Sequence, residues 1–209
     1  MKILVAAANG KAGRMIVKEA LDRGMDVTAA VRGENKSDAK NAIIKDILEL
    51  TKEDINGFDV IVDAAGGWTP ETVSIVPDAA KHLAGILKGT GTRLLVVGGA
   101  GSLFVDPEHT KTVADVTPYP EEVMPVLNAH KEALEELRKT DDVLWVYVSP
   151  AGDFRADGER TGKYILGGDE MKLNSKGESV ISYADYAVAM VDEIETGSHA
   201  KERISVVSE

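Results

Sequence analysis

Continuous apolar stretches occur at intervals along the chain, and most are followed by a segment in which apolar residues recur at helical spacing. The first stretch covers 2–8 and does not alternate with polar residues. This pattern is typical of a strand that is buried on both faces of a parallel sheet. Over 12–23 the apolar positions follow helical spacing, and Gly24 then acts as a helix stop. The alternation of the two patterns predicts a parallel sheet with helices packed against it.

Further strands and helices are predicted in the same way. The strands cover 26–31, 43–48, 58–64, 93–97, 143–149 and 204–207. The helices cover 69–88 with a break or restart at Pro77, 121–140 with a bend at Pro125, and 184–195, and a short helical turn covers 51–54. The segments 98–119 and 154–182 show no clear period. We therefore predict an α/β fold, a doubly wound parallel sheet of the Rossmann type, with a small irregular C-terminal region on the substrate side.

The composition narrows the class of protein. With 209 residues, the chain fits a single domain over 1–209 that can bury a full core. No apolar run approaches the roughly 20 residues that a membrane-spanning helix needs, so we expect no membrane partner. The apolar run 3–8 leads into a turn rather than a cleavage site, and the chain has no cysteine. We expect a cytoplasmic protein without a signal peptide.

The charge of the chain bears on its ligands. The formal net charge is −11. Because nucleic acids are bound by clustered Lys and Arg, this balance argues against a nucleic-acid partner. A phosphorylated small molecule would have to meet a locally basic pocket. We expect a small-molecule substrate and either a monomer or a homodimer.

A Gly-rich turn between the first strand and the first helix has the strongest local pattern. It reads Ala7-Ala8-Asn9-Gly10-Lys11-Ala12-Gly13 and fits G-x-x-G-x-x-G, with Ala7 in place of the first glycine. A dinucleotide pyrophosphate needs backbone N–H groups and the positive end of a helix dipole close by, with no side chain at the points of approach. The alternative is a tight turn without a ligand. We favour cofactor binding and predict contacts from Ala7, Asn9, Gly10, Lys11, Ala12, Gly13 and Arg14.

The end of the second strand selects between the two nicotinamide cofactors. NAD sites usually place an Asp or Glu there for the ribose 2′-hydroxyl, whereas NADP sites place an Arg near the 2′-phosphate. Here the strand ends Val31-Arg32-Gly33, and Glu34 follows. Arg32 therefore favours NADP(H) as the cofactor.

Several motifs along the chain resemble those of one enzyme family. Besides the turn and Arg32, they are Asp63-Ala64-Ala65-Gly66, Val97-Gly98-Gly99-Ala100-Gly101-Ser102, Lys131 and Ser149-Pro150-Ala151. In spacing and order they resemble the atypical short-chain dehydrogenase/reductases. The segments 164–169 and 182–187 are most similar to the small bacterial branch of NADH-flavin reductases, which is related to NAD-dependent epimerases. The resemblance implies cofactor contacts from Ala64, Ala65, Gly66, Lys131 and Pro150.

The departures from the family pattern bear on the chemistry. Carbonyl reductases of this family use a Tyr four residues before a Lys, with the Tyr as the general acid. If Lys131 matches that Lys, Leu127 occupies the Tyr position, and no proton donor stands there. Ser102 matches the family's active-site Ser, with turn capping as an equal alternative, and Tyr119 is the nearest candidate for a displaced acid. The resemblance thus makes Ser102, Lys131 and Tyr119 the catalytic candidates.

Flavin reduction avoids the need for this acid. The hydride passes to a ring in which charge is delocalised and the proton can come from water, so the protein has only to orient two planar rings. Trp68, Tyr119 and Phe154 are candidates to line such a pocket. We expect NADPH-dependent reduction of FMN, FAD or a related planar acceptor such as a quinone.

Two other functions stay open. A non-catalytic NADP(H) redox sensor fits the missing Tyr equally well. A sugar-nucleotide epimerase fits the family relationship but not Leu127 or the short C-terminal part. The four histidines lie far apart in sequence, and no metal site is predicted.

Overall fold

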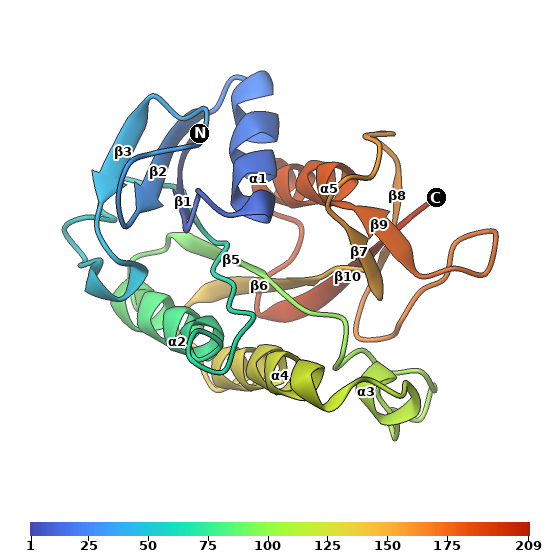
Figure 1. Ribbon diagram of the computed structural model, residues 1–209. Helices are drawn as coiled ribbons and strands as arrows, with labels where there is room; N and C mark the ends of the chain where they lie inside the picture. Colours follow the sequence, from blue (N-terminus) through green and yellow to red (C-terminus); the bar gives the residue numbers. More distant parts are fainter.

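The computed structural model describes all 209 residues and contains one eight-stranded sheet and a separate pair of short strands (Figure 1). Every neighbouring pair in the large sheet is parallel, except the antiparallel pair at the C-terminal edge. The strands in spatial order are β3 (Asn41–Ile44), β2 (Asp26–Val31), β1 (Lys2–Ala6), β4 (Val60–Asp63), β5 (Arg93–Val97), β6 (Leu144–Ser149), β10 (Glu202–Ser208) and β8 (Tyr164–Gly167). The predicted doubly wound Rossmann sheet is confirmed, with an antiparallel edge strand added.

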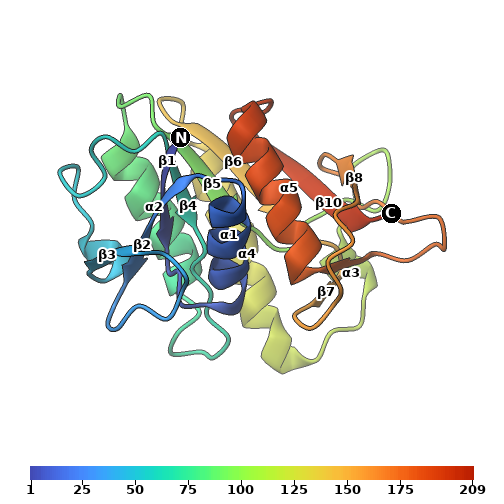
Figure 2. The same ribbon diagram turned by 90° about the horizontal axis from the view of Figure 1, so that it is seen from above.

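Two pairs of helices cover the two faces of the sheet. In Figure 1, α1 (Lys11–Asp22) and α5 (Tyr183–Thr196) lie above it, and α2 (Ile75–Leu87) and α4 (Met124–Arg138) lie below it. Figure 2 shows α1 and α5 side by side on their face. Each helix pair closes a separate apolar core against the sheet. No helix is long and apolar enough to cross a membrane.

Burial on both faces explains the continuous apolar run of the first strand. Ile3 and Val5 belong to the core under α1 and α5, and Leu4 and Ala6 belong to the core above α2 and α4. All four side chains have no exposed surface. Because successive side chains of a strand point to opposite faces, a central strand of a two-layered core has no position for a polar residue.

The strand order reverses between β1 and β4. From β1 the chain builds outward to β2 and β3, and it then returns to β4 and builds the other side. The Ala64 N–H donates to the Ala6 carbonyl at 3.1 Å, so the two strand ends stay joined beyond the last ladder pair. In open α/β sheets, ligands bind outside the carboxyl ends of the strands at such a point.

Several predicted boundaries were wrong. The third strand covers 41–44 rather than 43–48, and the 3-10 segment η1 (Ile47–Glu49) follows it. The short helical turn predicted over 51–54 lies in a run of turns, in which the Ile55 N–H donates to the Thr51 carbonyl at 3.3 Å. The helix predicted over 69–88 begins at Ile75. Pro77 lies in its first turn, where a proline is tolerated, and the residues before Ile75 form a separate turn.

The two segments without a clear period contain short elements. The loop 98–119 includes α3 (Val113–Val116), and the 3-10 segment η2 (Glu121–Val123) precedes α4. Pro125 lies in the first turn of α4, where a proline needs no bend. The region 154–182 is not irregular throughout, since it holds β8, most of β7 (Asp153–Arg155) and β9 (Val180–Ser182). The last two strands form the separate small sheet.

Packing at Gly98, directly after β5, generates a test of the fold. A Cβ at Gly98 would lie 2.3 Å from the ring of Tyr147, whereas a Cβ at Gly85 in α2 would meet nothing within 4 Å. We expect Gly98→Ala to lower the free energy of unfolding by about 1–3 kcal/mol through overpacking. Gly85→Ala should raise it by roughly 0.5–1 kcal/mol, because alanine is the better helix former. Urea unfolding followed by circular dichroism measures both, and equal stability of the two variants would contradict the packing described.

Candidate functional site

The carboxyl ends of the central strands lie in register, and this brings the loops that follow them to one edge of the sheet. Ala6 of β1 pairs with Asp63 of β4, and Asp63 pairs with Val96 of β5. Val97 pairs in turn with Val148 of β6. Figure 2 shows the loops after β2 and β4 and the amino end of α4 projecting at this edge. Candidate residues from distant parts of the sequence are therefore neighbours in the fold.

The Gly-rich turn after β1 is tightly folded. Ala7 has a positive φ of 56°, and its carbonyl accepts a bond from the Gly10 N–H at 3.0 Å. A Cβ at Gly13 would lie 2.8 Å from the same carbonyl, so only glycine lets α1 approach β1 this closely. At Gly10 a Cβ would be 3.3 Å from it and 4.0 Å from the Ala64 carbonyl. Gly10 therefore faces the gap between the first and fourth strand ends.

The amino end of α1 has free donors. No side chain caps Gly10, and the first turn of the helix contains no acidic residue. The Arg14 N–H donates to the Gly10 carbonyl at 2.9 Å. The earlier N–H groups of a helix have no partner within it, and their partial positive charge favours an anion. This end of α1 therefore suits a pyrophosphate, which is the group that the sequence predicts to bind at the turn.

Asn9 connects the turn to the loop that carries Arg32. Its amide nitrogen donates to the Glu34 carbonyl at 2.9 Å, and its amide oxygen accepts from the Lys36 N–H at 2.7 Å. Both polar ends of the side chain are thus used within the protein. Asn9, a predicted cofactor contact, holds the two loops together in the structure.

Three cations beside the turn have no ionic partner. Lys11, Arg14 and Arg32 are exposed and take part in no ion pair. In contrast, Arg23 at the other end of α1 is paired with several carboxylates, and Arg93 is paired with Glu193. In a chain of net charge −11, this group of unpaired cations provides the locally basic surface that a phosphorylated ligand needs.

The segment after β4 lies across the gap from the turn. Ala64 and Ala65 are buried, and Gly66 is exposed. The Ala65 N–H donates to the Asp63 carboxylate at 2.9 Å, which ties the segment to the end of the strand. Complete burial raises the pKa of Asp63 to about 7, although the bond from Ala65 opposes the shift. The sequence analysis quoted Asp63 within a motif but gave it no role.

The segment after β5 packs against a buried tyrosine and a partly buried histidine. The Tyr147 hydroxyl accepts from the Gly99 N–H at 3.0 Å and donates to the His130 carbonyl at 2.9 Å. Burial raises the pKa of Tyr147 above its usual range. Burial also lowers the pKa of His130 to about 4, so this imidazole is neutral near pH 7. Tyr147 has no exposed surface, so its hydroxyl is not accessible to a ligand.

Ser102 is held by a buried arginine from the C-terminal strand. The Arg203 guanidinium donates to the Ser102 hydroxyl and to its carbonyl, each at 2.9 Å. Its other nitrogens donate to Asp169 at 2.6 and 3.0 Å. The Arg203 side chain has no exposed surface. No local sequence pattern indicates this contact, because 101 positions separate the two residues.

The other catalytic candidates lie on or before α4. Leu127 packs against the loop after β5, since a Cβ at Gly101 would be 2.9 Å from its Cδ2. Lys131 is exposed. Hydrogen bonds from Thr112, with a weaker contribution from the Lys131 charge, lower the pKa of Asp115, which places Lys131 near α3. Tyr119 is half-buried, and its hydroxyl has no partner in the protein.

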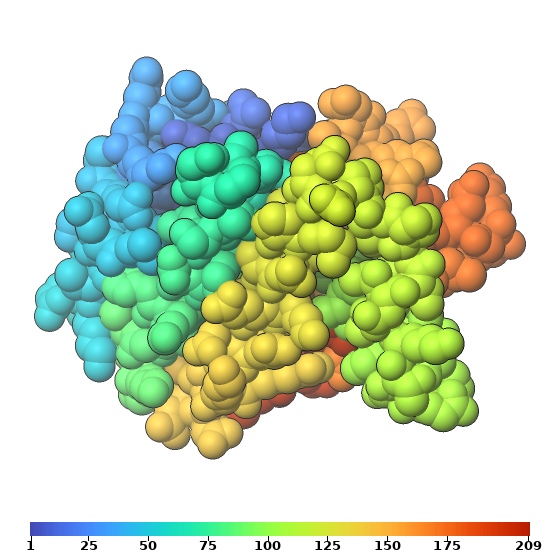
Figure 3. Space-filling view, turned by 60° about the horizontal axis from the view of Figure 1, so that its bottom comes forward, coloured from blue at the N-terminus to red at the C-terminus, as the bar shows by residue number.

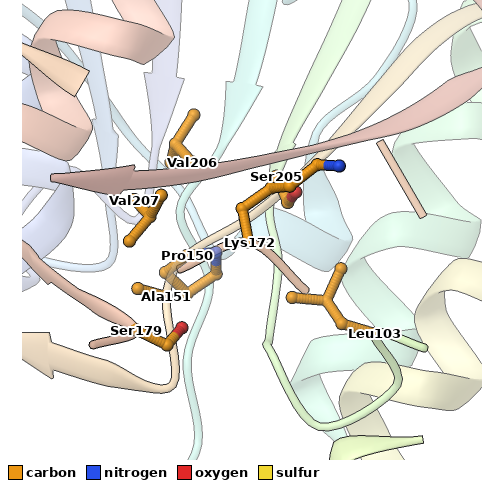
Figure 4. Close-up of a pocket in the computed structure, with 8 residues that line it drawn as sticks. All are labelled: Leu103, Pro150, Ala151, Lys172, Ser179, Ser205, Val206 and Val207. Atoms are coloured by element: carbon orange, nitrogen blue, oxygen red, sulfur yellow. The ribbon is translucent and has the colours of Figure 1, made fainter. Parts of the chain in front are cut away.

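The turn after β6 borders a small hollow under β10 (Figure 4). Pro150 and Ala151 line it together with Leu103 and Lys172, and it is too tight to hold a water molecule. The Ser149 hydroxyl, just before Pro150, is buried without a hydrogen-bond partner. Pro150 itself is buried.

The remaining features of the structure lie outside the Gly-rich turn or form part of the packing. Phe154 packs on the rings of Tyr183 and Tyr186, at 3.9 and 4.8 Å between ring centroids. No three metal-binding side chains come together. A cavity of about 260 Å³ lies between the 52–59 turns and Thr90, at the amino ends of β4 and β5. It opens at the opposite edge of the sheet from the Gly-rich turn.

The doubly wound sheet, the free helix end at its switch point and the unpaired cations beside it define a dinucleotide-binding protein of the Rossmann class. Comparison with known proteins makes this assignment specific. Residues 7–196 match the NAD(P)H-binding family, and the chain belongs to that family.

Similar proteins cover the chain from end to end. The Bacillus subtilis protein YwnB is 47% identical over 212 residues, which include 100% of this chain and 99% of that protein. A crystal structure from Streptococcus pneumoniae, of a "putative NADH-flavin reductase", is 50% identical with a TM-score of 0.97 and complete coverage of both chains. A "putative epimerase" from Bacteroides thetaiotaomicron is 34% identical with a TM-score of 0.84, over 99% of this chain and 96% of the other.

The buried carboxyl of Asp63 makes stability depend on pH. Its folded pKa of about 7 lies above the usual aspartate value of 3.8, so the folded protein binds this proton more tightly than the unfolded chain does. The stabilisation is complete below the unfolded pKa and is lost as the pH rises toward 7. Within this window the free energy of unfolding should fall by about 1.4 kcal/mol for each pH unit.

Asp63→Asn is the matched variant, because the amide can still accept from the Ala65 N–H but does not titrate. Urea unfolding of both proteins at several pH values between 4 and 8 measures the difference. Relative to the variant, the native protein should lose stability as the pH rises. Parallel pH profiles of the two proteins would show that Asp63 keeps an ordinary pKa.

Proposed function

We propose that the protein is an NADPH-dependent reductase of free flavin, or of a related planar acceptor such as a quinone. The observation that carries this proposal is that Leu127, which cannot donate a proton, occupies the position of the family's acid and packs against the loop after β5. The Tyr147 hydroxyl is buried and hydrogen-bonded, and burial lowers the pKa of His130 to about 4, which leaves its ring neutral near pH 7. A carbonyl substrate needs a proton donor within hydrogen-bond reach of the developing alkoxide. A conjugated ring does not.

The preference for NADPH rests on Arg32. Its guanidinium lies at the carboxyl end of β2, is exposed and has no internal partner. A 2′-phosphate is a suitable partner for such a group, because charge-assisted hydrogen bonds are roughly twice as strong as neutral ones. Asn9 supports this role indirectly, since its two bonds keep the Arg32 loop against the Gly-rich turn.

The protein's part in the reaction is binding and orientation. In the overall reaction a hydride leaves the nicotinamide C4 and joins the flavin N5, and water supplies the proton that completes the dihydroflavin. The free N–H groups at the start of α1 would bind the pyrophosphate, with charge from Lys11 and Arg14 nearby. Lys131 is proposed to hold the nicotinamide ribose, as the family resemblance implies. The name of the Streptococcus pneumoniae structure agrees with this choice of acceptor.

Loss of the Arg32 charge should narrow the cofactor preference. We expect wild-type protein to bind NADPH more tightly than NADH, and Arg32→Ala to reduce the ratio at least tenfold, since a hydrogen bond to a charged group contributes about 1.5–3 kcal/mol. Lys88→Ala, which removes an exposed cation before β5 at the opposite edge, should leave the ratio unchanged. Calorimetric titration gives the four affinities. Equal binding of NADPH and NADH by wild-type protein would refute the assignment.

The acceptor preference follows from the missing acid. We expect anaerobic NADPH oxidation with FMN, FAD or riboflavin and almost none with simple ketones. Lys131→Ala should slow flavin reduction, because a shift of about 1 Å in the reacting groups can cost roughly a hundredfold in rate. Lys139→Ala on the same helix removes a cation that pairs with Glu136 and should have little effect.

Absorbance at the nicotinamide band reports all of these rates. Efficient ketone reduction would overturn the argument from Leu127 and would direct attention to the free hydroxyl of Tyr119. Tight NADPH binding without turnover of any acceptor would instead favour a redox sensor. An epimerase activity would require a group at the Leu127 position that this chain lacks.

A further inference from the structure

Trp68 is the most exposed large apolar side chain of the protein. Its exposed fraction is 74%, against 57% for Ile44 and 53% for Met1. The other tryptophan, Trp145, is 3% exposed and belongs to the core. An exposed indole of this size leaves a large apolar face in water, and such faces commonly mark binding sites.

The loop that carries Trp68 is braced by its own hydrogen bonds. The Thr72 hydroxyl accepts from the N–H groups of Trp68 and Thr69, at 3.3 and 3.2 Å. A Cβ at Gly67 would lie 2.1 Å from the Thr72 carbonyl, so the loop closes on itself where only glycine fits. The Thr72 and Val73 N–H groups both donate to the Thr69 carbonyl. The backbone therefore presents the indole from a defined turn rather than from a loose loop.

The indole stands beside the predicted cofactor segment. A Cβ at Gly66 would lie 3.8 Å from the Trp68 Nε1, so this edge of the ring lies over Gly66. The loop projects at the carboxyl edge of the sheet (Figure 2). In Figure 3 the teal segment around residue 70 lies beside the yellow-green segment around residue 120, which leads into α4. Figures 1 and 2 show the same neighbourhood.

The strand order places Trp68 on the side where the acceptor should bind. Arg32 follows β2, on one side of β1, and would draw the 2′-phosphate there. With the pyrophosphate at Gly10, the reactive end of a dinucleotide must extend toward β4, β5 and β6. Trp68 follows β4, the first strand on that side. An acceptor that meets the nicotinamide must therefore enter beside this loop.

We propose that Trp68 is the stacking platform for the planar acceptor, and that the acceptor is a fused conjugated ring such as the isoalloxazine of FMN or riboflavin. This inference rests on the proposed function. Among the aromatic candidates, Phe154 is occupied by Tyr183 and Tyr186, whereas the indole face is free. A planar ring that needs no proton donor still needs orientation, and an offset-stacked indole provides it.

The test compares wild-type protein with Trp68→Ala and Trp68→Phe. The dissociation constant of FMN is measured by flavin fluorescence quenching with saturating NADP⁺, and the KM of FMN by anaerobic NADPH oxidation. Trp68→Ala should raise both constants about tenfold, equivalent to about 1.4 kcal/mol of stacking, and Trp68→Phe should recover most of the loss. The dissociation constant of NADPH should stay at the wild-type value. Leu144→Ala, which removes an exposed apolar side chain at the start of β6, is the matched control and should change nothing.

The possible failures point to different conclusions. An active wild-type protein whose FMN constants do not change in Trp68→Ala would overturn the stacking assignment alone. Loss of NADPH affinity in Trp68→Ala would overturn it as well, because the indole would then belong to the dinucleotide site. A wild-type protein that reduces neither flavin nor a quinone with NADPH would overturn the proposed function itself.

Discussion

The close approach of α1 to the end of β1 is the contact on which the site depends. It requires glycine at position 13, where any Cβ would press on the Ala7 carbonyl at 2.8 Å. It also requires the positive φ of Ala7, which turns the chain sharply from strand to helix. The contact directs the free N–H groups of the helix toward the gap between β1 and β4. The helix end lies at this gap, and for that reason the unpaired cations and the loop after β4 can contact the same ligand.

Much of this arrangement could be predicted from the sequence, because it depends on local patterns. A central parallel strand must be apolar on both faces, so β1, β4 and β5 are recognisable as continuous runs. The third strand was misplaced because its side chains are mostly exposed, and burial therefore does not select its residues. The strands within 154–182 are short, and their pairing with distant elements leaves no local pattern.

The polar interior was the part that sequence reasoning missed. Arg203 fixes the loop at Ser102 through a contact that only the folded sheet creates. Asp63 and His130 are ordinary polar residues in the sequence, and burial in the fold is the main cause of their shifted pKa values. These groups shape the floor of the site. The sequence positions of Lys11, Arg14 and Arg32 identified them as candidates for the phosphate site. That they form no ion pair could be learned only from the structure.

The account therefore describes a site that binds and orients but does not donate protons. Its central claim is tested most directly by single-turnover reduction of FMN with NADPH deuterated at C4, in H₂O and in D₂O. Deuterium at the transferred position should slow the reaction, while the rate should be independent of solvent deuteration and of pH between neutral and mildly alkaline conditions. A large solvent isotope effect together with a bell-shaped pH profile would show that a protein acid takes part in the hydride step, and would contradict the account.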